Sequence, residues 1–267
     1  MSLSYFKRGR GVRRRLRLLK LEGYILIQKI THRYFLSTSD SYEYLMRRMN
    51  FIIQSGPFKG MKYINQSNGS VLFPKIVGTY DKPIHDIIRQ LVNTSYDNYI
   101  DIGCAEGYYA VGLAHELQKV RNNFKVYAYD VDPTAITNLI ALANLNDVLN
   151  FLDIGSLFQS RDFDKFTGKT VVICDIEGAE LSLLDPSKSE NLLHFDLLVE
   201  VHDGGKESNI IKDSLRNRFC ATHLIEIIDY VDYCDRHFDF IEYSHEKQFM
   251  NEGRRYGLEW MWLKRKN

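Results

Sequence analysis

Hydrophobic residues in the second half of the chain form short apolar runs that alternate with stretches of helical periodicity. The runs predict strands over residues 99–102, 125–129, 148–152, 170–174, 196–201, 221–228 and 258–263. The stretches between them predict helices over residues 108–120 and 133–144, from residue 179, and over residues 207–219. Strands separated by helices favour a mostly parallel sheet with helices on both faces. We therefore expect an α/β fold with a seven-stranded sheet flanked by helices.

The first part of the chain follows a helical period instead. Residues 12–36 place apolar side chains three and four positions apart, with basic residues between them, which predicts an amphipathic helix. Residues 41–53 predict a second helix with Asp40 or Ser41 as its N-cap. We expect a basic helical N-terminal extension over residues 1–70.

The α/β domain is expected to cover residues 71–267. Residues 61–82 read as a link made of loop and strand. Pro83 is well placed in the first turn of a helix that ends near Thr94.

Basic residues gather in the segment 7–20, although the formal net charge of the whole chain is only +1. The overall charge therefore makes no case for nucleic acid as a partner. Arginines interleaved with leucines are typical of a solvated helix face that covers the main domain or a partner in a homodimer. The alternative is peripheral contact with an anionic membrane.

The composition is that of an ordinary globular protein, with 45% hydrophobic and 26% charged residues. No apolar run approaches the roughly 20 residues that span a bilayer, and the N-terminus lacks the apolar core and cleavage site of a secretion signal. The four cysteines show no paired spacing, which favours reduced thiols. We expect a cytoplasmic protein, with peripheral membrane attachment as the alternative.

A glycine turn follows the first predicted strand and opens the next helix. Gly103 and Gly107 permit a sharp turn and a close approach of backbone to a ligand, and the helix N-terminus points at that ligand. The spacing is not that of the dinucleotide fingerprint. Asp101 would repel a pyrophosphate but suits an ammonium group, which S-adenosylmethionine carries beside its sulfonium. We expect this turn to hold the methionyl part of that ligand.

Acidic residues at the next two strand ends extend this interpretation. Asp130 ends the second strand, where a carboxylate can accept hydrogen bonds from both ribose hydroxyls of an adenosine. Asp132 is instead expected to cap the helix that begins at Pro133. Asp153 and Ile154 follow the third predicted strand and are expected to meet the adenine edge.

The fourth and fifth strand ends carry the candidate catalytic groups. Asp175 lies beyond the fourth strand, where ligands of open α/β sheets bind, and Glu177 is close enough to share work as a general base. Glu200 and His202 point to one side of the fifth strand because side chains alternate. Glu180 is expected to cap or to pair. An oxygen-rich site for a divalent metal such as Mg²⁺ could also be formed by Asp175, Glu177, Glu200 and His202. Their spacing carries no diagnostic metal signature.

These motifs together resemble the FkbM-type family of S-adenosylmethionine-dependent methyltransferases. The segment Asp175–Glu180, Asp-Ile-Glu-Gly-Ala-Glu, is similar to the family's Asp-(Val/Ile)-Glu-Gly-(Ala/Tyr)-Glu, and residues 199–202 look like its fifth strand. The resemblance covers roughly residues 70–264. It places Tyr80 near the cofactor, and it departs from the usual turn at Ala105, where a glycine is common.

The resemblance implies a Rossmann-like class I methyltransferase fold, S-adenosylmethionine as cofactor, and O-methylation, often of a sugar or polyketide hydroxyl. The acceptor is then a small molecule or a glycan. A catalytically inactive binding or scaffold protein is the alternative. A nucleic-acid methyltransferase is disfavoured, because no Asn-Pro-Pro-Tyr-like segment follows the fourth strand. The aromatic residues Tyr230, Tyr233, Phe238, Phe240 and Tyr243 are expected to pack a hairpin rather than line an acceptor cleft.

Overall fold

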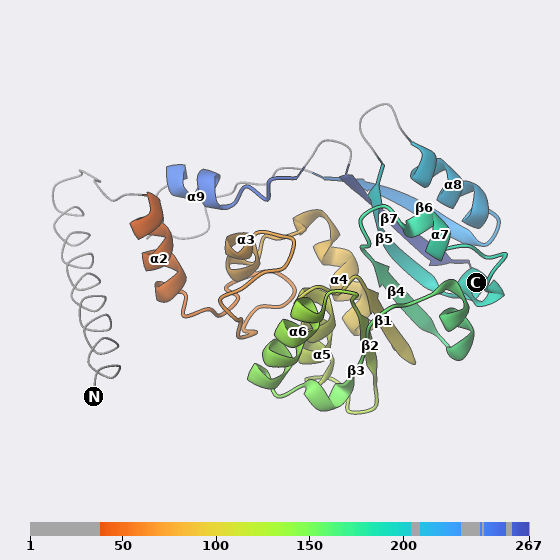
Figure 1. Cartoon of the computed structure of the whole chain (residues 1–267), viewed down its shortest axis with the longest axis horizontal. Coiled ribbons are helices and arrows are strands. Elements are labelled where there is room, and N and C mark those ends of the chain that lie inside the picture. Colours follow the sequence, from red (N-terminus) through yellow and green to blue (C-terminus); the bar gives the residue numbers. More distant parts are fainter. Residues whose placement is uncertain (1–37, 204–208, 231–240, 242, 255–257, 267) are drawn as a thin grey trace.

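The computed structural model describes residues 38–203, 209–230, 241, 243–254 and 258–266 (Figure 1). In this part of the chain, a seven-stranded sheet has the strand order β3-β2-β1-β4-β5-β7-β6. The strands are β1 (Asn98–Ile102), β2 (Val126–Tyr129), β3 (Leu152–Gly155), β4 (Thr170–Cys174), β5 (Asp196–His202), β6 (His223–Asp229) and β7 (Leu258–Arg265). The expected α/β fold with a seven-stranded sheet is confirmed.

Strands β1 to β5 pair in parallel, and β7 is antiparallel to both of its neighbours, β5 and β6. Ile102 of β1 is paired with Cys174 of β4, and Tyr129 of β2 is paired with Ile102. Parallel strands in this register end at the same edge of the sheet. The residues that follow β1, β2 and β4 therefore meet there, where ligands of open α/β sheets bind.

Side chains on the two faces of the sheet enter two separate hydrophobic clusters. Tyr99 of β1 belongs to the cluster formed with α4 (His85–Asn93), α5 (Tyr108–Leu117) and α6 (Pro133–Leu145). Its neighbour Ile100 belongs to the opposite cluster, where α7 (Glu180–Leu183) and α8 (Ile210–Phe219) pack. This alternation is the two-residue period of a strand that is buried on both faces.

Residues of the predicted N-terminal extension also enter the first cluster. Helix α2 (Thr38–Arg48) contributes Leu45, and the loop after it contributes Phe58, which lies against α5 at Gly112. Figure 1 shows α2, α3 (Leu72–Val77) and α9 (Tyr243–Phe249) together on one side of the sheet. A boundary at residue 70 therefore divides a continuous cluster. No helix in the described ranges is both long and apolar enough to cross a bilayer.

Two local predictions for the part of the chain before the sheet were wrong. The helix expected over residues 41–53 begins at Thr38 and ends at Arg48, so Asp40 and Ser41 lie inside it and do not cap it. The link over residues 61–82 contains α3 and a 3₁₀ turn, η1 (Lys82–Ile84), in place of a strand.

The third strand was predicted too early. Residues 149–151 form a 3₁₀ turn, η2 (Leu149–Phe151), and β3 starts only at Leu152. The predicted helix over residues 12–36 and the aromatic residues Tyr233, Phe238 and Phe240 lie outside the described residues.

Candidate active site

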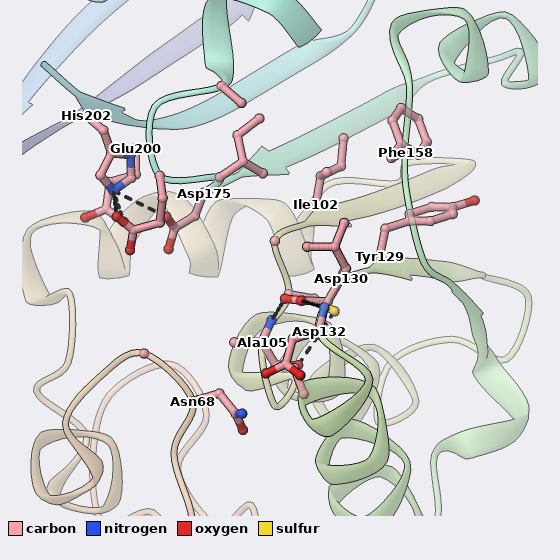
Figure 2. A pocket seen from close by; sticks show the side chains of 18 of the residues that line it. Asn68, Ile102, Ala105, Tyr129, Asp130, Asp132, Phe158, Asp175, Glu200 and His202 are labelled. Atoms are coloured by element: carbon pink, nitrogen blue, oxygen red, sulfur yellow. Dashed lines mark hydrogen bonds and ion pairs between the residues drawn. The ribbon is translucent and has the colours of Figure 1, made fainter.

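A cavity of about 1400 Å³ opens at the carboxyl ends of β1, β2, β4 and β5. Its walls come from the turn after β1, from residues 129–132 and 156–160 after β2 and β3, and from residues 68–70 of the N-terminal part. Figure 2 shows two groups of labelled residues in it. Asp130, Asp132 and Ala105 lie on one side, and Asp175, Glu200 and His202 lie together on the other.

The glycine turn is shaped by contact between strands. Gly103 has φ of +79°, and a Cβ built on it would lie 1.7 Å from the carbonyl oxygen of Asp175. Only glycine allows the ends of β1 and β4 to approach this closely. Gly107 has φ of +95° and caps α5, but it does not line the cavity. Ala105 adopts a left-handed φ of +48°, a conformation in which glycine would be less strained.

Asp101 lies beneath the turn and not on the cavity wall. Its carboxyl is 2% exposed and accepts the N–H of Ala110, while Oδ2 has no partner among the described residues. Burial raises the pKa of Asp101 to about 8, with a smaller contribution from the charge of Asp175. A buried oxygen without a partner is costly. Because Asp101 does not line the cavity, this oxygen does not reach a ligand there, and the predicted contact of Asp101 with an ammonium group is not supported.

Asp130 stands on the cavity wall and is held by the backbone. Its Oδ2 accepts the N–H of Ala105 and its Oδ1 accepts the N–H of Asp132, both at 2.8 Å (Figure 2). Asp132 in turn accepts the N–H of Thr134 at 2.8 Å, which confirms it as the N-cap of α6. The carboxylate of Asp130 is thus fixed at the end of β2, where a ribose would bind.

Asp153 and Ile154 do not line the cavity. Both lie within β3, which begins four residues later than its predicted start at residue 148, and Asp153 is exposed. The residues that follow β3 and do line the cavity include Leu157 and Phe158. The ring of Phe158 packs edge-on against Tyr129, with centroids 4.7 Å apart. The wall expected for adenine is therefore formed by the later residues.

The sequence-predicted catalytic residues come together around one imidazole. Nε2 of His202 lies 3.6 Å from Oδ1 of Asp175 and 3.6 Å from Oε2 of Glu177, and 3.9 Å from Oε2 of Glu200. Nδ1 of His202 lies 2.8 Å from Oε1 of Glu180. Glu180 therefore pairs, and the spacing of Glu200 and His202 on β5 turns both side chains into the cavity as predicted.

The electrostatics of this group differ from residue to residue. Burial, and then the charges of Asp175 and Asp81, raise the pKa of Glu200, so Glu200 holds the proton of its hydrogen bond to Asp175. Burial alone would lower the pKa of His202, but the hydrogen bond to Glu180 and the charge of Asp175 outweigh it and raise the pKa. The imidazole is thus a stronger base than a free histidine.

A buried arginine completes this end of the cavity, and the sequence interpretation gave it no role. Arg254 donates hydrogen bonds to Asp81 and Glu200, and its Nε lies 3.0 Å from Glu252. Asp81 has a left-handed φ of +52° and accepts the hydroxyl proton of Tyr109. Asp81 and Arg254 both lie within residues 70–264, which the resemblance covers, but it gave neither of them a role.

Tyr80 links this arginine to the cavity. Its side chain is 8% exposed, it lines the cavity, and the guanidinium of Arg254 lies 5.1 Å from the centre of its ring. The predicted cofactor residue therefore lies at the end of the cavity that holds the carboxylates and His202.

Glu106, within the glycine turn, anchors the loop that covers the cavity from the N-terminal side. Its carboxylate accepts hydrogen bonds from the ammonium group of Lys75 at 2.5 Å, from the hydroxyl of Tyr63 at 2.7 Å and from the backbone N–H of Asn68 at 2.8 Å. These contacts fix residues 68–70 on the cavity wall. The glycine turn therefore positions a second wall as well as its own.

Asp175, Glu200 and His202 bring three potential ligand atoms within 4.8 Å of one another. Glu200, however, already receives a cation from the protein itself, because Arg254 donates to it. A second cation beside the guanidinium would be repelled. We therefore assign no metal to these groups.

No protein-family profile and no curated protein sequence matches the chain. Among solved structures, the chain is similar to the O-methyltransferase TomG from Streptomyces achromogenes in complex with S-adenosylmethionine, with a TM-score of 0.48 and 10% identity over 72% of this chain and 82% of that one. It is also similar to an rRNA methylase from Streptococcus thermophilus, with a TM-score of 0.42 and 13% identity over 69% of this chain and 97% of that one. Identities this low say nothing of activity or substrate. The fold class itself is α/β, with a seven-stranded sheet in which β7 is antiparallel to its neighbours.

Proposed function

We propose that the chain is an S-adenosylmethionine-dependent methyltransferase that methylates an acceptor hydroxyl. One observation carries the proposal: a single cavity joins the turn at Gly103 and the fixed carboxylate of Asp130 to the group formed by Asp175, Glu200 and His202. The first wall suits an adenosine ligand with a charged tail. The second wall holds a proton acceptor.

The residues present fit the cofactor. Asp130 offers fixed carboxylate oxygens to a ribose, and Phe158 and Leu157 offer an apolar wall to a base. When bound, S-adenosylmethionine supplies a methyl group on a sulfonium, and it departs as S-adenosylhomocysteine with the electron pair of the broken carbon–sulfur bond. The protein aligns the two reactants, which is the main source of rate in such a transfer.

At the other wall, Asp175 and Glu177 orient the acceptor hydroxyl and His202 lies among them. The acceptor oxygen gains the methyl group, and its proton passes to a basic group of this wall. Following the FkbM-type resemblance, the acceptor is a hydroxyl of a sugar, a glycan or another natural product.

We further propose that the basic residues 7–20, which lie outside the described residues, either cover the main domain or a homodimer partner, or meet an anionic membrane from the cytoplasmic side. Flotation of the full chain with anionic vesicles, against a variant with Arg13, Arg14 and Arg15 changed to Gln, separates the two. Equal flotation of both proteins contradicts the membrane version.

Isothermal titration calorimetry with S-adenosylmethionine and with NAD tests the class of ligand. We expect binding of S-adenosylmethionine and none of NAD, because no dinucleotide fingerprint follows β1. Asp130→Asn should weaken binding, while Asp147→Asn, an equivalent change at an exposed position after α6, should not. Absence of binding at millimolar ligand would favour the inactive scaffold instead.

A further inference from the structure

We infer that Glu180 is a positioning residue, which holds His202 with Nε2 toward the acceptor and makes His202, and not Asp175, the group that takes the hydroxyl proton. This inference rests on the proposed function. It assigns separate tasks to residues that the sequence could only group together.

The contact between Glu180 and His202 is shielded from water. Glu180 is 0% exposed, and its Oε1 accepts both Nδ1–H of His202 at 2.8 Å and the N–H of Gly178 at 3.0 Å. A carboxylate in this position selects the tautomer with the proton on Nδ1, because it can only accept a hydrogen bond. Nε2 then carries the lone pair and faces the cavity.

Nε2 of His202 is available to a ligand. No hydrogen-bond partner of Nε2 lies in the described ranges, and the closest carboxylate oxygens, on Asp175 and Glu177, are 3.6 Å away. A hydroxyl placed there reaches Nε2 and at least one carboxylate within hydrogen-bond distance. The site is thus open at the atom that must receive the proton.

Asp175 is less suited to this task. Its carboxylate already accepts the proton of Glu200, and Arg254 holds Glu200 in place from the other side. The carboxylates of Asp175 and Glu177 are instead well placed to stabilise the imidazolium that forms. The titratable and charged groups that face His202 are Glu180 on α7, Asp175 and Glu177 after β4, and the protonated Glu200 on β5 with its partner Arg254.

When the hydroxyl loses its proton, Nε2 gains it, and Nδ1 keeps its own proton on Glu180. The imidazolium then carries one positive charge beside the buried carboxylate of Glu180. Burial disfavours that charge, but Glu180, Asp175 and Glu177 favour it, and the net effect raises the pKa of His202. A base of this strength at neutral pH suits proton transfer in the transition state.

NMR of the full chain labelled with ¹⁵N-histidine tests this inference without an acceptor or a cofactor. The chain has 8 histidines, and His202→Gln identifies the signals of His202. In the neutral protein we expect the Nδ1–H tautomer, with a titration midpoint above 6.5. Glu180→Gln should move that midpoint down toward 6.5, and Glu180→Asp, which keeps the charge, should restore part of the rise.

Glu190→Gln is the matched control, because it removes one carboxylate charge at an exposed position outside the site. Thermal unfolding shows whether each variant is folded. If Glu180→Gln does not fold, the tautomer of His202 in the wild-type protein still tests the inference. An Nε2–H tautomer, or a midpoint that neither Glu180 variant moves, overturns the inference. Calorimetry with S-adenosylmethionine is scored separately, so failure of the proposed function is distinguished from failure of the role of Glu180.

Discussion

Gly103 lies directly against the backbone of Asp175, where a Cβ would fall 1.7 Å from the carbonyl oxygen. This contact joins the turn after β1 to the first residue after β4. The proposed cofactor wall and the candidate catalytic wall therefore lie side by side at one edge of the sheet. The energetic effect of adding a Cβ at this contact can be measured.

Gly103→Ala should lower the free energy of unfolding by at least about 2 kcal/mol, because the methyl group both overlaps the carbonyl and forces a left-handed φ. Urea denaturation measures it. Gly60→Ala is the control, since Gly60 has a φ of +93° but nothing within 4 Å of its Cβ position. Equal losses at the two positions would mean that backbone strain, and not the contact with Asp175, explains Gly103.

The buried pair of Lys75 and Glu106 should be strongly coupled. Their side chains are 3% and 0% exposed, so Glu106→Gln leaves an ammonium without its counterion and should cost about 3 kcal/mol of unfolding free energy. Adding Lys75→Met should recover part of that loss. A double-mutant cycle by chemical denaturation measures the coupling, and strictly additive losses would contradict it.

Asp101 should make stability depend on pH. Because its pKa is raised to about 8 in the folded chain, against 3.8 for the free side chain, the folded state binds the proton more tightly. Its contribution to stability is full below pH 3.8 and is lost as the pH rises toward 8 and above. The neutral variant Asp101→Asn should therefore gain in melting temperature relative to wild type between pH 5 and pH 9. A difference that stays constant over this range would show that Asp101 is ionised throughout.

Asp130 and Asp153 separate the two interpretations of the cofactor wall. Asp130→Ala should weaken S-adenosylhomocysteine binding by about tenfold or more, since hydrogen bonds to a charged group are worth about 1.5–3 kcal/mol. Asp153→Ala should leave the affinity unchanged, because Asp153 lies on β3 outside the cavity. Calorimetry gives both values. If Asp153→Ala lowered the affinity for S-adenosylhomocysteine as much as Asp130→Ala, the predicted contact of Asp153 with adenine would be supported instead.

Arg254 is a cation that the protein itself places beside Glu200, one of the candidate metal ligands. Treatment with EDTA should leave the melting temperature unchanged, whereas Arg254→Met should lower it, because Asp81 and Glu252 would lose the cation between them and Glu200 would lose a hydrogen-bond donor. Stabilisation of the wild-type protein by Mg²⁺, removed again by EDTA, is the result that this account does not allow.

The parallel strands were the most predictable part of the fold. The apolar run from Thr170 to Cys174 is bounded by polar residues, and β4 has the predicted limits. The apolar run at residues 148–152 predicted a strand that starts too early. Val148 is buried, but it lies in the connection after α6 and not in a strand. Burial alone does not distinguish a strand from a packed turn. That shift of register moved the predicted adenine contact to Asp153 and Ile154.

The site was predictable where it depends on strand ends. Asp130 and Asp175 follow β2 and β4, His202 is the last residue of β5, and the parallel register brings these strand ends together. The pair of Asp81 and Arg254 was not predictable, since the two residues are 173 positions apart and lie in segments without a repeating pattern. The role of Glu180 also required the structure, because its first-turn position equally suits a helix cap.

A crystal structure of the protein with S-adenosylhomocysteine tests the central claim most directly. The account predicts that the ribose hydroxyls meet the carboxylate of Asp130 and that the sulfur faces the side of the cavity with Asp175 and His202. A ligand bound elsewhere, or a sulfur turned away from His202, would contradict the assignment of the two walls.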